Sequence, residues 1–151
     1  MGHQYEQEFV ESLRAGFMGE GNESDYRFVP RLLVNDQEQG SDVLSALKEQ
    51  LKGCQRLDFS VAFITSSGVE AIVQLLIALR DQGIPGRILT TTYNNFNDPA
   101  ALRKLLEFPN IELRAYQGAM HTKGYFFQHG EMNAVVIGSA NLTQTALSKN
   151  K

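Results

Sequence analysis

The sequence predicts an α/β fold: a mixed, mainly parallel sheet flanked by helices and followed by a C-terminal β-hairpin. Between residues 57 and 116, three β-rich runs alternate with two apolar runs at helical spacing, an order typical of parallel strands joined by helices. Two short β-rich runs then follow each other across a short polar link, which is typical of an antiparallel hairpin. A length of 151 residues fits one such domain.

Residues 1–30 are predicted to form an N-terminal helix and loop, and residues 31–151 the domain itself. Apolar residues at helical spacing predict the first helix over 5–18. Caps, breakers and periodicity place the remaining elements. In chain order we expect a strand at 31–34, a helix from the Ser41 cap to Gly53, a strand at 57–64, a helix at 69–81, a strand at 87–91, a helix capped by Asp98 with Pro99 first, a strand at 111–116, hairpin strands at 123–127 and 134–139, and a helical turn at 142–147.

Composition limits the class of protein. There are 14 Lys and Arg against 17 Asp and Glu, a net charge of −3, so the surface as a whole is not built for nucleic acid. Acidic residues gather before residue 43 and basic ones predominate from Arg80 onward, which allows a local basic site but fits a mixed solvated surface equally well. The apolar runs are too short for a bilayer span, and the first residues do not resemble a signal peptide. The single Cys54 reads as an apolar filler, and we expect a cytoplasmic protein.

Four polar residues flank the predicted hairpin. His121 and Lys123 stand where its first strand begins, and Ser139 and Asn141 stand where its second strand ends. A turn near residue 130 pairs residues whose numbers sum to about 261, which brings all four side chains to the same end of the sheet. Strand alternation puts His121 and Lys123 on one face.

These residue types suit phosphoryl transfer. A neutral imidazole can attack phosphorus, and an ammonium and an amide can hold the non-bridging oxygens as their charge changes. The Ser139 hydroxyl can add a donor. Each residue alone is weak evidence: a single His at a strand end is more often structural, and Asn141 alone reads best as a helix N-cap. The joint spacing carries the information.

The pair His121-Thr122-Lys123 and Gly138-Ser139-Ala140-Asn141 resembles the signature of the phospholipase D (HKD) superfamily. The stretches 58–63, 88–93 and 141–143 also resemble the N-terminal phospholipase D-like domain of large bacterial DEAD/DEAH-type helicases. This resemblance covers roughly residues 30–150.

The resemblance implies a phospholipase D-like fold and a metal-independent phosphodiesterase or nuclease. In that superfamily two motif copies form one active site: one His forms a phosphohistidine, and the other protonates the leaving oxygen and then activates water. One copy per chain implies a homodimer. The implied catalytic residues are His121, Lys123, Ser139 and Asn141, with no metal and no cofactor. The implied partners are nucleic acid, with DNA first, and a covalently linked helicase region, without a membrane.

Two departures from the family pattern leave alternatives open. Gln128 stands where the signature has an acid, with Glu131 nearby, and the chain ends at Lys151, before the downstream acid that orients the His. We therefore expect a piece of a longer protein. The alternative function is a catalytically silent nucleic-acid-binding or dimerisation module of a helicase. A lipid phosphodiesterase is a third option, and nothing in the sequence indicates membrane association.

Other candidate residues have less specific patterns. His129 is expected in the exposed hairpin turn. Asp58 and Ser60 could reach the site from a neighbouring strand. Residues 93–96 follow a strand end, where they could stack on or hydrogen-bond a substrate or simply form a structural loop. Residues 125–127 are expected in the core. The three histidines lack metal-ligand spacing.

Overall fold

The computed structural model describes residues 30–36 and 42–149. Contacts divide the chain after Leu33, and the unit that begins at Val34 is described here by itself. The helix expected over 5–18 lies outside the described residues.

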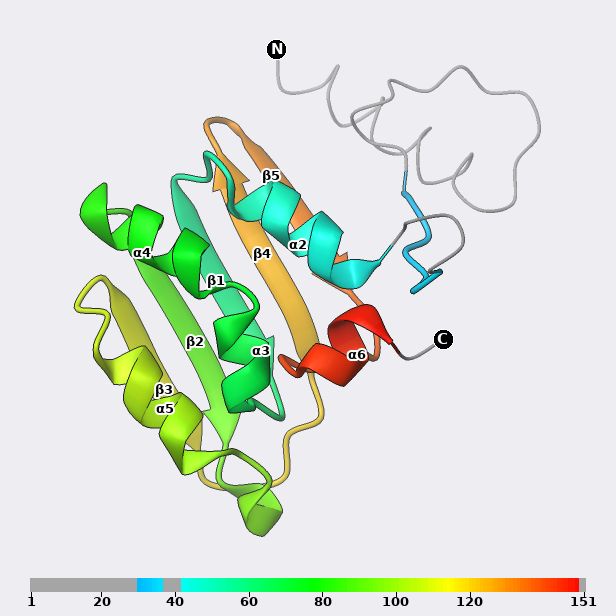
Figure 1. Ribbon diagram of the computed structural model, residues 1–151, viewed down its shortest axis with the longest axis vertical. Helices are drawn as coiled ribbons and strands as arrows, with labels where there is room; N and C mark the ends of the chain where they lie inside the picture. The colour runs from blue at the N-terminus through cyan, green and yellow to red at the C-terminus, as the bar shows by residue number, and fades with distance from the viewer. Residues whose placement is uncertain (1–29, 37–41, 150–151) are drawn as a thin grey trace. The chain divides into compact units, whose positions relative to one another are not determined.

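A five-stranded mixed sheet forms the centre of this unit (Figure 1). Its spatial order is β3-β2-β1-β4-β5. The β1–β2 and β2–β3 pairs are parallel, whereas β1–β4 and β4–β5 are antiparallel, so the sheet is mixed rather than mainly parallel. The strands are β1 (Arg56–Val61), β2 (Gly86–Thr91), β3 (Ile111–Tyr116), β4 (Lys123–His129) and β5 (Met132–Ile137).

The antiparallel half arises because residues 117–122 contain no helix that could carry the chain back along the sheet. The chain therefore turns directly into β4, which pairs with the free edge of β1 and continues into β5. Gly124 faces Ile137 and His129 faces Met132, which is the register expected from the sequence.

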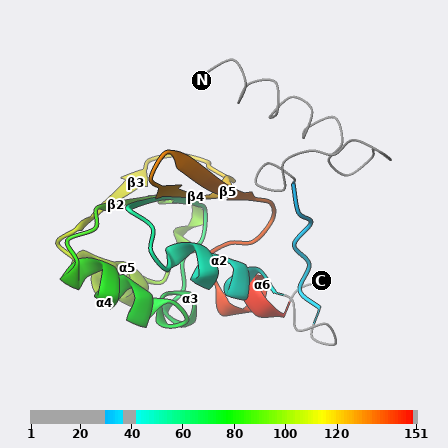
Figure 2. The same ribbon diagram turned by 90° about the horizontal axis from the view of Figure 1, so that it is seen from above.

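All the described α-helices cover one face of the sheet (Figure 2). They are α2 (Val43–Leu51), α3 (Ser66–Glu70), α4 (Val73–Asp81), α5 (Pro99–Leu106) and α6 (Gln144–Ser148). Buried side chains such as Phe59, Ile88 and Tyr125 pack between the helices and the sheet. The other face, named here the open face, carries the exposed side chains of Leu89, Phe126, Val135, Ile137 and several charged residues.

Several sequence expectations need correction. Phe126 lies on the open face and not in the core, because it alternates with the buried Tyr125 and Phe127 along β4. The helix expected over 69–81 is two helices: α3 starts early at its Thr65 cap, and Ile72 has non-helical angles where α4 begins. The Ile72 side chain is buried in the core.

The first described segment also differs from expectation. Residues 31–34 form no strand, because Leu32 and Val34 are exposed and pair with no described strand. Asp42 caps α2, accepting a hydrogen bond from Ser45 N at 2.6 Å, and Ser41 lies outside the described residues. Buried Asn35 links two helices: its Oδ1 accepts from Val43 N at 3.0 Å, and its Nδ2 donates to the Ala146 carbonyl at 3.0 Å.

Candidate functional site

The motif residues lie at the edge of the sheet where β1 and β2 end and β4 begins (Figure 1). Lys123 is the first residue of β4 and pairs with Val61, the last residue of β1. His121 is exposed in the preceding loop. Antiparallel pairing of β1 with β4 therefore brings the His-x-Lys segment to the carboxyl ends of the parallel strands, where sites in α/β sheets usually form.

Lys123 is buried and constrained. Its side chain is only 8% exposed, and its Nζ donates to the His121 carbonyl at 2.8 Å. The same Nζ lies 5.8 Å from the ring centroid of Phe63, within range of a cation–π contact. Burial lowers the pKa of Lys123 below its usual value. The ammonium is thus held against the motif backbone.

The His121 imidazole approaches the same aromatic ring. Its centroid lies 6.3 Å from that of Phe63, and the two rings are inclined at 71°. Among the described residues, no carboxylate hydrogen-bonds to the imidazole. The acid that would orient a nucleophilic His is therefore not supplied by this part of the chain.

Asn141 is fixed by the backbone of Phe63. Its Oδ1 accepts a hydrogen bond from Phe63 N at 3.1 Å, which leaves the amide Nδ2 as the group that can donate to a ligand. Asn141 does not cap a helix, which was the alternative reading of this residue taken alone. Thr143 caps α6, and its Oγ1 accepts from Ala146 N at 3.2 Å.

Ser139 and its neighbours form the second side of the site. Ser139 is exposed, and no hydrogen bond within the described part of the chain joins it to His121 or Lys123. A side chain at Gly138 would meet nothing within 4 Å, so the space beside the backbone is open there. Buried Tyr125 holds the segment from the core side, because its hydroxyl donates to the Ala140 carbonyl at 2.9 Å.

Phe63 is the residue that connects the site, although it was not among the candidates that the sequence indicated. Its ring contacts the His121 imidazole and the Lys123 ammonium, and its backbone N–H binds Asn141. Its carbonyl accepts from Leu142 N at 3.1 Å. The available signal was an aromatic residue at the carboxyl end of a buried strand, next to the strand that carries His-x-Lys.

The two candidates on β1 separate in the structure. Ser60 does lie beside the motif, because its Oγ is 2.8 Å from Thr122 Oγ1. Asp58 instead pairs on the open face with Arg87 at 2.7 Å and Arg56 at 3.0 Å. Burial opposes its ionisation, but the hydrogen bonds from both arginines outweigh burial and lower the pKa of Asp58.

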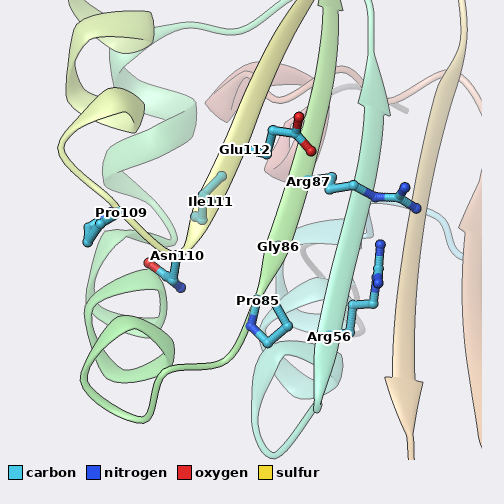
Figure 3. A pocket seen from close by; sticks show the side chains of 8 residues that line it. All are labelled: Arg56, Pro85, Gly86, Arg87, Pro109, Asn110, Ile111 and Glu112. Carbon is cyan, nitrogen blue, oxygen red and sulfur yellow. The ribbon is translucent and has the colours of Figure 1, made fainter.

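A pocket of about 490 Å³ lies at the opposite end of the sheet (Figure 3). Its lining includes Gly86 and Ile111, the first residues of β2 and β3, and the Arg56 and Arg87 side chains. This pocket is therefore separate from the site that the motif residues form.

The end of β4 corrects a further expectation. His129 lies in the strand and not in an exposed turn, because β4 continues two residues beyond the predicted end. Its Nε2 is buried without a hydrogen-bond partner among the described residues.

Gln128, the position that is acidic in the family signature, stands about 17 Å from Lys123 along the strand, at ~3.3 Å per residue. Among the described residues no group of three potential metal ligands gathers.

The loop after β2 approaches the motif. Residues Tyr93–Asn95 form a 3-10 turn, η2, and the ring of Phe96, which follows it, packs edge-on against Phe63 with centroids 5.0 Å apart. This loop is thus joined to the motif through one shared aromatic ring.

Comparisons with known proteins bear on this arrangement. The crystal structure of polyphosphate kinase from Porphyromonas gingivalis is similar, with a TM-score of 0.50 and 14% identity. The match covers 83% of this chain and 27% of that one, so the chain spans about a quarter of its length, and the similarity concerns the fold alone. No match was found among the curated proteins.

In the part of the chain that the structure describes, no helix has the length and apolarity of a membrane span.

The family described as "Cardiolipin synthase, PLD-like domain" matches residues 47–151, which include every motif residue named above. Phosphodiester chemistry is the activity that this family membership suggests. The match covers more than half of the sequence, and the chain therefore belongs to the phospholipase D-like (PLD-like) domain family.

Proposed function

We propose that this domain hydrolyses a phosphodiester of nucleic acid, with His121 as the nucleophile and without a metal ion. The observation that carries the proposal is the gathering of His121, Lys123 and Asn141 around Phe63. A nucleophile, a cation and an amide donor at one sheet edge are the groups that an in-line attack on phosphorus requires.

The reaction proceeds in two steps. A nitrogen of His121 attacks phosphorus, and the phosphorus–oxygen bond to the leaving group breaks while that oxygen takes a proton from His121 of the partner subunit. This second imidazole then takes a proton from water, whose oxygen attacks phosphorus and displaces the first imidazole. Lys123 and the Asn141 Nδ2 hold the non-bridging oxygens, and the Ser139 hydroxyl adds a donor.

The active form in this proposal is a homodimer. Residues 1–151 carry one motif, and the reaction needs a nucleophile and a separate proton donor. His121 is exposed at the sheet edge, where a second copy can approach it. The wider proposal is a cytoplasmic nuclease module of a helicase or restriction-type protein, which rests on the resemblance of the sequence to helicase-linked domains.

The second candidate is a silent nucleic-acid-binding or dimerisation module. One observation favours it: no carboxylate among the described residues orients the His121 ring, and an unoriented imidazole is a poorer nucleophile. The change at Gln128 carries less weight, since that side chain stands far along β4 from the motif. Salt-dependent binding without cleavage would favour this candidate.

The test compares His121→Ala with His129→Ala, a matched histidine change at the far end of β4. Labelled single- and double-stranded DNA and RNA are incubated with each protein in the presence of chelator. The mass of each protein in solution is measured to test for the proposed dimer. We expect His121→Ala to lose activity by at least about 1,000-fold with its circular dichroism unchanged, while His129→Ala remains active. Excess His121→Ala subunits should also inhibit the wild type through mixed dimers. A fully active His121→Ala protein, or loss of wild-type activity in chelator, would contradict the proposal.

A further inference from the structure

The loop after β2 exposes two aromatic rings, and one of them, Phe96, packs beside the motif. Tyr93 is 49% exposed and Phe96 is 56% exposed. The Phe96 ring lies edge-on to Phe63 at an angle of 83°, and Phe63 is the ring that His121 and Lys123 contact. A ligand phosphate held by the motif would therefore have the Phe96 ring close by, and Tyr93 is exposed on the same loop.

The backbone of this loop has an uncommon conformation. Asn94 and Asn95 have φ angles of 56° and 52°, in the left-handed region that most residues other than glycine seldom adopt and that asparagine adopts more often than most. Asn97 ties the loop to the ends of two neighbouring segments: its Nδ2 donates to the Thr91 carbonyl at 2.6 Å, and its Oδ1 accepts from Ile64 N at 2.7 Å. Such conformations persist where the surroundings impose them, and they cluster at ligand-binding positions.

The chemistry of the loop suits a heterocyclic base. From Tyr93 to Phe96 it offers two flat rings and two amides and contains no aliphatic side chain. Rings stack on the faces of bases, and amides hydrogen-bond to their edges. A duplex covers both faces of each base with its neighbours, so an unpaired base fits such a ring better.

We infer that Phe96, with Tyr93, stacks an unpaired base next to the phosphate held by His121 and Lys123, so that the ligand is single-stranded nucleic acid. The inference rests on the proposed function for the class of ligand, but stacking is measurable as binding, without any cleavage.

The chain contains no Trp, so Phe96→Trp introduces a single fluorophore at the loop. Titration with single-stranded oligothymidylate should quench its emission, and a duplex of equal length should do so only at much higher concentration. Phe126→Trp is the matched control: Phe126 is 44% exposed, lies on the open face, and should show no change. Equal quenching at both positions would overturn the inference.

Alanine variants measure the affinity. Phe96→Ala should weaken single-strand binding roughly 5- to 100-fold, whereas Phe126→Ala changes it by less than about two-fold. Phe96→Tyr should bind as the wild type does, which separates stacking from folding. Absence of single-strand binding, equal affinity of the two alanine variants, or a preference for phosphatidylglycerol vesicles would overturn the inference. Phe96-dependent binding without hydrolysis would contradict the proposed function and leave the inference standing.

Discussion

Gly68 in α3 packs directly against the chain that follows the motif. A methyl group at this position would lie 2.0 Å from the Leu142 carbonyl oxygen and 2.9 Å from the Thr143 Cα. Both are backbone atoms, so no flexible side chain can move aside. The same carbonyl accepts a hydrogen bond from Thr65 N at 3.1 Å, and Leu142 is itself fully buried.

Gly68→Ala should therefore destabilise the fold by about 2–4 kcal/mol. Overpacking contributes roughly 1–3 kcal/mol, and the strained or broken Thr65–Leu142 hydrogen bond contributes about 1 kcal/mol. Urea unfolding followed by circular dichroism would show a midpoint lower by roughly 1–2 M. Because Leu142 adjoins Asn141, phosphodiesterase activity should also fall at urea concentrations where the protein is still folded.

Gly138→Ala is the matched control. Nothing lies within 4 Å of the added methyl group, and the φ of Gly138 is not in the left-handed region. Its free energy of unfolding should stay within about 0.5 kcal/mol of the wild type. If the two variants are equally stable, α3 does not pack on Leu142 as described, and the placement of Asn141 loses its support.

Two further predictions concern buried polar groups. Lys123→Met should change the free energy of unfolding by less than about 1 kcal/mol, because it removes a buried charge and keeps the side-chain volume. In the hydrolysis assay the same variant should lower activity at least ~100-fold. Lys104→Met, at an exposed lysine, is the control and should not lower activity. Tyr125→Phe should cost about 1 kcal/mol in urea unfolding through the lost hydrogen bond to Ala140. Burial raises the pKa of Tyr125 above the usual value near 10. The free energy of unfolding of the wild type is therefore constant with respect to this group below pH 10 and falls above pH 10, as Tyr125 ionises in the unfolded state. This fall should be smaller in Tyr125→Phe, whereas the control Tyr116→Phe, at an exposed tyrosine, should keep it.

The sequence predicts well those elements that local chemistry determines. Asp98 caps α5 with Pro99 at its first position, as the sequence indicates. The strand expected at 111–116 has the observed bounds of β3. The register of the hairpin also follows from its turn and its alternation, both of which are local.

Features set by distant contacts were not predictable in this way. The packing of α3 on Leu142, which is remote in sequence, leaves no local signal at Gly68. The exposure of Phe126 depends on which sheet face the helices cover, and alternation alone does not say which. The role of Phe63 required three contacts from separate parts of the chain.

The hydrogen bonds that join Phe63 and Thr65 to Asn141 and Leu142 also determine when the site can form. The two segments are 78 positions apart at the Phe63–Asn141 contact, and every strand of the sheet except β1 lies between them in the sequence. During synthesis, β1 to β5 must leave the ribosome before Asn141 can reach Phe63. Contacts of such long sequence separation form late in folding. The sheet can therefore assemble before the motif does, and a nascent chain carries its imidazole and ammonium without the amide until Asn141 emerges.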